Sequence, residues 1–179
     1  MWNRREFLRG AALVGGAVAL PGLSGCAMGS KARGHVVVVG GGFGGATVAK
    51  YLRMWSQQGV DVTLIERNPT FISCPISNLV IGGSKTLADI TTPYDNLVKR
   101  HGVQIVQDRV TSIDADKRVV KLAGGAELAY DRLIVSPGVD FMWDSLPGMT
   151  KPGAQDKVLH AWKAGAQTVA LRKQLEAMP

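Results

Sequence analysis

The sequence predicts an α/β domain built on a parallel sheet, and two apolar runs with a helix between them support that prediction. The first run, residues 36–39, is four consecutive valines, which favour an extended strand covered on both faces. Residues 46–57 contain neither Pro nor Gly and place apolar side chains at helical spacing. The second run, residues 60–65, is again strand-like. A strand, a helix and a strand in this order are typical of a parallel βαβ unit.

A glycine turn joins the first run to the helix. Gly40, Gly42 and Gly45 fit the pattern G-x-G-x-x-G, which permits a tight turn, close approach of a pyrophosphate, and close packing of helix on strand. Glu66 follows Gly45 by 21 residues, where a carboxylate meets a ribose hydroxyl. We therefore expect residues 34–150 to form a Rossmann-like domain that binds FAD or NAD with an unphosphorylated ribose. The alternative is a plain glycine turn with a solvated Glu66.

The remaining elements predict a helix, an antiparallel excursion and a return to the sheet. Thr92 is expected to cap a helix that has Pro93 at its first position, turns Leu97 and Val98 inward and ends at Gly102. Strand-like runs follow at residues 103–106, 109–113, 119–122, 127–129 and 133–135. The three middle runs are separated by turn residues and predict a β-meander lying over the sheet. The last run is expected to return to the core.

The first 29 residues are interpreted as an export signal. Arg4 and Arg5 open a twin-arginine pattern, followed by a small, apolar stretch at residues 10–20 that is too short to span a bilayer. The alternative is a basic amphipathic N-terminus. Cys26 stands in a sequence resembling a lipoprotein cleavage box, so it either becomes a lipid-anchored N-terminus or is discarded by ordinary cleavage nearby. Twin-arginine export carries folded proteins, so we expect a periplasmic protein that captures its cofactor before export.

Charge and histidine spacing limit the classes of partner. The formal net charge is +7, but the basic residues beyond the leader are scattered, without a run and without interleaved aromatics. A nucleic acid is therefore not expected as a partner. His35, His101 and His160 lack metal-ligand spacing, so no metal site is expected. No Ser/His/Asp signature or carboxylate pair stands out, and no catalytic residue is assigned.

Cys74 lies eight residues past Glu66, within a stretch at residues 68–83 whose prolines and glycine pair predict irregular structure. Eight extended residues reach up to about 26 Å, enough to follow an extended FAD from its adenosine ribose to its flavin ring. A thiolate there could attack the activated 8-methyl group of the ring and form a thioether. The alternative is an inert buried cysteine, the commoner fate of a lone Cys.

Several segments resemble one known family. Residues 130–138 resemble the second FAD fingerprint of flavoproteins that bind two dinucleotides, with Ser136, Pro137 and Gly138 in place of the usual Ala-Thr-Gly. From about residue 34 onward the chain is similar to the flavoprotein subunit of flavocytochrome c sulfide dehydrogenase. The segments that carry this similarity are residues 44–52, 62–66, 74–78, 80–83 and 160–165.

The resemblance implies a cofactor, a reaction and a partner. In that family the matching cysteine carries FAD covalently, and the protein oxidises sulfide in the periplasm and passes electrons through the flavin to a c-type cytochrome subunit. By resemblance, Val110 holds the adenine through its backbone. The cofactor-binding residues expected on all these grounds are Gly40, Gly42, Phe43, Gly44, Gly45, Glu66, Arg67, Cys74, Val110, Ser136, Pro137 and Gly138.

The chain also departs from the family pattern. The family continues with a second nucleotide-binding-like domain and a C-terminal domain, whereas this sequence stops at Pro179, after a helical run expected at residues 161–178. Residues 151–179 are therefore interpreted as a helix leading into a missing second domain. Either the sequence is a fragment of a longer protein, or another chain supplies the remaining part. The redox-active cysteine pair of the family is absent, since the cysteines are Cys26 and Cys74. The alternatives are a non-catalytic truncated domain, or a related quinone- or NADH-linked flavoprotein.

Overall fold

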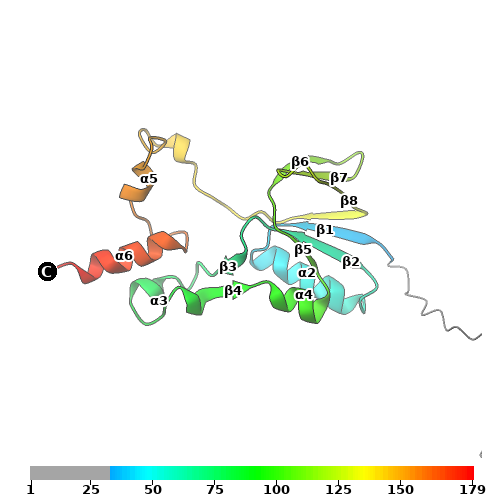
Figure 1. Cartoon of the computed structure of the whole chain (residues 1–179), viewed down its shortest axis with the longest axis horizontal. Helices are drawn as coiled ribbons and strands as arrows, with labels where there is room; N and C mark the ends of the chain where they lie inside the picture. Colours follow the sequence, from blue (N-terminus) through cyan, green and yellow to red (C-terminus); the bar gives the residue numbers. More distant parts are fainter. Residues whose placement is uncertain (1–32) are drawn as a thin grey trace, which may run out of the picture. The chain divides into compact units, whose positions relative to one another are not determined.

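The computed structural model describes residues 33–179, so the expected twin-arginine signal and Cys26 lie outside the described residues. Figure 1 shows how the elements are arranged along the chain. They are β1 (His35–Val39), α2 (Phe43–Trp55), β2 (Asp61–Ile65), β3 (Thr70–Ile72), α3 (Asn78–Ile81), η1 (Ala88–Ile90), β4 (Thr91–Pro93), α4 (Asp95–His101), β5 (Gln104–Val106), β6 (Val110–Asp114), β7 (Val119–Leu122), β8 (Glu127–Ala129), β9 (Arg132–Val135), η2 (Trp143–Ser145), α5 (Ala154–Lys157) and α6 (Ala166–Glu176). Within this part of the chain, every helix falls short of the length or apolar character that a membrane span needs.

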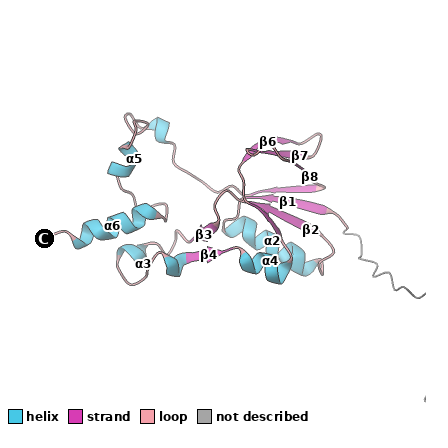
Figure 2. Ribbon diagram, in the orientation of Figure 1, coloured by secondary structure: helices cyan, strands magenta, loops and turns pink. Residues whose placement is uncertain are grey.

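A parallel sheet forms the core, as predicted. Its strands are ordered β5-β2-β1-β9 and all neighbours run parallel, with Val37 of β1 opposite Thr63 of β2 and Leu133 of β9. The strand of four valines is therefore internal in the sheet. Figure 2 shows these strands fanning out beside the helices α2 and α4. Because parallel strands share one direction, the carboxyl ends of β1, β2 and β9 meet at one edge.

The two faces of the sheet are covered by different structures. Val36 and Val38 pack with Ala49 of α2 and with Tyr94 in one buried cluster. Val37 points to the opposite face and packs with Val120 and other side chains of an antiparallel three-stranded sheet, ordered β6-β7-β8. That second sheet is the predicted β-meander. Alternating valines thus serve two cores, which explains why the whole run is apolar.

The segment before α4 differs from the expectation. Thr92 and Pro93 do not open a helix, because residues 91–93 form β4, which pairs antiparallel with β3. The helix begins at Asp95 and ends, as predicted, at Gly102, whose φ is +64°. The buried face also differs from the expectation, because Leu97 packs into the core while Val98 is 46% exposed.

Two further ranges also differ from their expected structure. Residues 68–83, expected to be irregular, contain the short strand β3 and the one-turn helix α3. The helical run expected from residue 161 begins only at Ala166. Gly165 donates its N–H to the Thr168 hydroxyl at 3.1 Å and accepts from the Thr168 N–H at 3.0 Å, which fixes the helix start there.

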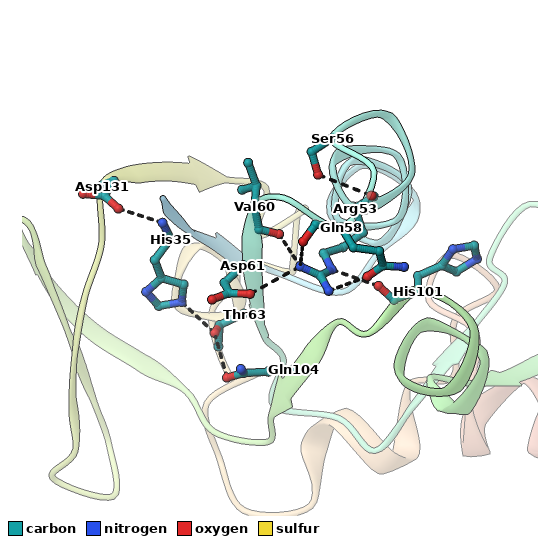
Figure 3. Close-up of polar contacts among 10 residues, drawn as sticks. All are labelled: His35, Arg53, Ser56, Gln58, Val60, Asp61, Thr63, His101, Gln104 and Asp131. Atoms are coloured by element: carbon teal, nitrogen blue, oxygen red, sulfur yellow. Dashed lines mark hydrogen bonds and ion pairs between the residues drawn. The ribbon is translucent and has the colours of Figure 1, made fainter. Parts of the chain in front are cut away.

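A buried arginine ties together the ends of α2, α4 and β2 (Figure 3). Arg53 is only 9% exposed. Its guanidinium donates to the His101 carbonyl at 2.9 Å, to the Gln58 carbonyl at 3.2 Å and to the Val60 carbonyl, and it reaches the Asp61 carboxylate at 3.3 Å. A guanidinium offers five N–H donors in a rigid fork, which suits several carbonyls converging on one point.

His35 makes a smaller junction between the sheet and the meander, and Figure 3 shows its contacts with Thr63 and Asp131. Its two ring nitrogens contact the Ala129 carbonyl at 2.9 Å and the Thr63 hydroxyl at 2.8 Å. Its backbone N–H donates to the Asp131 carboxylate at 2.7 Å. The first residue of β1 is therefore fixed to β2 and to the connection that enters β9.

Replacing Arg53 by Met should lower the free energy of unfolding by about 2–4 kcal/mol, because the carbonyls that the guanidinium serves would lose their donor. Urea denaturation of the full chain measures this. Lys50→Met, one turn earlier on the same helix and free of ion pairs among residues 33–179, is the matched control and should stay within about 0.5 kcal/mol. Equal effects of the two substitutions would contradict the assigned role of Arg53.

Candidate dinucleotide-binding site

The glycine turn lies where β1, β9 and α2 meet. Gly40 has φ +97°, and a Cβ built there would stand 2.1 Å from the Ser136 carbonyl oxygen. A Cβ at Gly45 would stand 1.8 Å from the Gly40 carbonyl oxygen. Contacts this short are impossible, so the closing of the turn and the packing of α2 against it both require glycine. The packing of the protein backbone alone therefore requires glycine at the first and third positions of the pattern.

Gly42 is in a different position. A Cβ built at Gly42 would have no heavy atom within 4 Å. Gly42 is also the N-cap residue of α2, where no side chain caps the helix. The first N–H groups of a helix lack partners within the helix and carry the positive end of its dipole. Open space beside such donors is what a phosphate group needs.

Glu66 lies directly after β2 and reaches the glycine turn. Its Oε2 accepts a hydrogen bond from the Gly41 N–H at 2.7 Å, and its Oε1 accepts from the Asn68 backbone and side-chain amides at 2.9 and 2.8 Å. A carboxylate has about four acceptor positions, so these three bonds leave capacity for another donor. The carboxylate that the sequence assigned to a ribose thus contacts the glycine turn directly.

Tyr94 completes the turn, and sequence reasoning missed it. Its hydroxyl donates to the Gly41 carbonyl at 3.0 Å, and the residue is 8% exposed. Burial, with a smaller contribution from the negative charge of Glu66, raises the pKa of Tyr94 to about 12. No local signal marks Tyr94, because it reaches the turn only through the β3–β4 pairing and the start of α4.

Arg67 follows Glu66 but is engaged elsewhere. Its guanidinium pairs with Asp140 at 3.0 Å, and Lys163 donates to both oxygens of the same carboxylate at 2.8 Å. The Lys163 hydrogen bond, with smaller contributions from the Phe141 N–H and from Arg67, lowers the pKa of Asp140 to about 2. Phe141 in turn packs against Trp143, His160 and Trp162. The structure therefore joins Arg67 to the segment after β9.

The remaining residues expected to bind the cofactor are placed around the turn or farther along. Ser136 lies over the turn, since a Cβ at Gly44 would meet its hydroxyl at 2.7 Å. Pro137 adjoins Gly40, and Gly138 has φ +75°. Phe43 is 60% exposed at the start of α2, with its ring 4.7 Å from that of Phe71.

Val110 and Cys74 have no contact with the turn among those described. Val110 begins β6 and packs on the meander side of the sheet. Cys74 is an exposed free thiol just beyond β3, and its carbonyl accepts hydrogen bonds from the Ser77 N–H and hydroxyl at 3.1 and 2.8 Å. The described site thus combines amide donors, open space and one carboxylate, which suits a nucleoside diphosphate.

Known proteins resemble this chain in sequence and fold. It is 32% identical over 104 residues to the sulfide-quinone reductase of Aquifex aeolicus, covering 58% of this chain and 24% of that protein. A shorter match, 58% identical over 46 residues, covers 26% of this chain and 94% of the flavoprotein chain of a flavocytochrome c sulfide dehydrogenase from Chlorobaculum thiosulfatiphilum. The crystal structure of the Aquifex aeolicus sulfide:quinone oxidoreductase superposes with a TM-score of 0.67 at 26% identity, covering 79% of this chain and 31% of that one.

The matches cover very different shares of this chain and of its relatives. The chain spans about a quarter of the length of the sulfide:quinone oxidoreductases that it matches. The family model for pyridine nucleotide-disulphide oxidoreductases, however, matches residues 34–177, which is nearly all of the chain described here. Together with the parallel sheet and the glycine turn, this match shows that the chain belongs to the pyridine nucleotide-disulphide oxidoreductase family.

Proposed function

We propose that this chain is the FAD-binding part of a flavoprotein oxidoreductase that takes electrons from sulfide. The observation that carries the proposal is the contact between the Glu66 carboxylate and the Gly41 N–H at 2.7 Å, beside the open space at Gly42. A carboxylate acceptor beside backbone N–H donors is the arrangement that an adenine nucleotide requires for its ribose and its diphosphate, and this supports the proposal. Members of this family and the sulfide:quinone oxidoreductases are flavoproteins, which favours FAD over NAD.

Four parts of the chain would hold FAD. The Gly42 and Phe43 amides at the start of α2 would bind the diphosphate, and Glu66 would accept a bond from the adenosine ribose. Val110 would contact the adenine through its backbone, and Cys74 would bind the flavin ring through a thioether at the 8-methyl carbon. Bound FAD would supply the two-electron and one-electron chemistry, which the side chains of this chain do not.

We assign sulfide as the electron donor and a c-type cytochrome subunit as the acceptor. The support is the 58% identity to a flavoprotein chain whose name includes flavocytochrome c. The twin-arginine pattern at Arg4 and Arg5 adds a periplasmic location, where c-type cytochromes work and where an NADH-linked enzyme has little substrate. Cys26 remains the candidate lipid anchor. Mass spectrometry of the mature N-terminus separates an acylated Cys26 from ordinary cleavage.

A sulfide:quinone oxidoreductase is the second candidate. It is favoured by longer sequence matches, such as the protein from Mus musculus at 31% identity over 125 residues, and by the TM-score of 0.67. The two candidates differ in the acceptor. Anaerobic reduction of the purified flavoprotein with sulfide, followed by addition of either ferricytochrome c or a soluble quinone, distinguishes them by which acceptor reoxidises the flavin.

In a Cys74→Ser background, where FAD is held without a covalent bond, Glu66→Ala should weaken FAD retention by about ten- to a hundredfold, because a hydrogen bond to a charged group contributes roughly 1.5–3 kcal/mol. The measurement is flavin content per chain after gel filtration, with thermal unfolding followed in parallel. Glu127→Ala, which removes a carboxylate paired with Lys121 on the meander, is the control and should keep its flavin. Unchanged retention in Glu66→Ala would count against the ribose role.

Cys74→Ser should release all flavin on acid precipitation, whereas the wild-type chain should keep its yellow colour in the pellet, because a thioether survives acid. Ser73→Ala, at the adjacent position, is the control and should behave like the wild type. Free flavin in the wild-type supernatant would contradict covalent attachment but would still be consistent with FAD binding. A colourless wild-type protein would contradict the assignment of FAD as the cofactor.

A further inference from the structure

The glycine turn contains a run of glycines whose peptide groups rotate easily. Gly40, Gly41 and Gly42 are consecutive, and glycine populates positive and negative φ about equally. A flip of the Gly41–Gly42 peptide would exchange the directions of its C=O and N–H at little steric cost. A carbonyl would then face the phosphates, where a donor is required. Something outside the turn must therefore fix this peptide if the turn is to bind an anion.

Tyr94 contacts this same peptide. Its hydroxyl donates to the Gly41 carbonyl at 3.0 Å. In a planar trans peptide the C=O and the following N–H point in opposite directions. The hydrogen bond to Tyr94 therefore holds the Gly42 N–H pointing away from the Tyr94 hydroxyl, and a Cβ built at Gly42 would meet no heavy atom within 4 Å. Among residues 33–179, no oxygen accepts a hydrogen bond from that N–H.

We propose that Tyr94 is a positioning residue, whose hydroxyl holds the Gly41–Gly42 peptide in the orientation that presents the Gly42 N–H to the diphosphate of a dinucleotide. The identity of the ligand rests on the proposed function, whereas the orientation of the peptide does not. Glu66 holds the preceding peptide through the Gly41 N–H at 2.7 Å. Both sides of Gly41 are thus fixed, each by a different element of the fold.

The surroundings of Tyr94 make it suitable for this role. Its ring packs in the buried cluster with Val36, Val38 and Leu64, so the hydroxyl has a fixed position. Its N-cap place in α4, directly after β4, anchors its backbone as well. Burial and the nearby Glu66 charge keep the hydroxyl protonated, with a pKa of about 12. It therefore remains a hydrogen-bond donor at any physiological pH.

The test compares Tyr94→Phe with Tyr51→Phe, each in a Cys74→Ser background from which bound flavin can be washed. Titration calorimetry with ADP and with adenosine separates the diphosphate from the nucleoside. Tyr94→Phe should weaken ADP binding about tenfold, the loss expected for one hydrogen bond of about 1.4 kcal/mol. It should leave the weaker adenosine binding unchanged. Tyr51, which packs on Trp55 along α2, should tolerate the change.

A second measurement needs no ligand. ¹⁵N relaxation dispersion should show microsecond-to-millisecond exchange at Gly41 and Gly42 in Tyr94→Phe, and none in the wild type or in Tyr51→Phe. Exchange together with weaker ADP binding supports the proposal. Unchanged Gly42 dynamics, or equal loss of ADP and adenosine binding, overturns it. If the unsubstituted Cys74→Ser background binds no ADP, the proposed function fails, and the relaxation data alone decide the role of Tyr94.

Alkaline titration gives an independent check. The folded pKa of Tyr94, about 12, lies above the ordinary tyrosine pKa of 10.0. The stabilisation from the neutral hydroxyl is therefore complete below pH 10 and is lost as the pH rises towards 12. The wild type should lose stability in urea across this window by an amount that Tyr94→Phe lacks. An identical pH dependence in the two proteins would mean that the hydroxyl is not buried against the turn.

Discussion

The structure depends on how closely the backbone approaches itself where β1 ends. The Gly40 Cα stands so near the Ser136 carbonyl, and the Gly45 Cα so near the Gly40 carbonyl, that even one methyl group at either place has no room. These contacts bring together the carboxyl ends of β1 and β9 and the first turn of α2. They also fix the start of α2 relative to the edge of the sheet, where β2 delivers Glu66. Glu66 meets the Gly41 N–H at this place.

What could be predicted from the sequence is what depends on neighbouring residues. The four valines of β1, the glycine spacing and the αL residue Gly102 each have a local physical cause, and the structure has the elements they predicted. Thr92 and Pro93 also carry a strong local signal, for a helix start, but pairing with β3 outweighs it. A short strand that gains its hydrogen bonds from a distant segment leaves little trace in its own residues.

At the site, too, local spacing could be predicted and long-range contacts could not. Glu66 could be proposed as the ribose-binding carboxylate because its distance from the glycines reflects the length of one βαβ unit. Tyr94 could not, because it reaches Gly41 across 53 positions of the sequence. Arg67 was expected to bind the cofactor, and its ion-pair partner Asp140, 73 positions away, could not be predicted from the sequence either. Sequence patterns therefore locate the glycine turn and Glu66, while long-range contacts determine which side chains support them.

Gly40, Gly42 and Gly45 differ in the space that surrounds them. At Gly40 and Gly45 a methyl group would collide with backbone, whereas at Gly42 it would point into empty space. Alanine at position 42 is thus compatible with a folded chain, and its methyl group would clash only with a bound ligand. Under the proposed function, a relative that no longer binds a nucleotide could carry another residue at this position while keeping the other two glycines. The residue at position 42 therefore indicates whether a relative of this chain has kept or lost nucleotide binding.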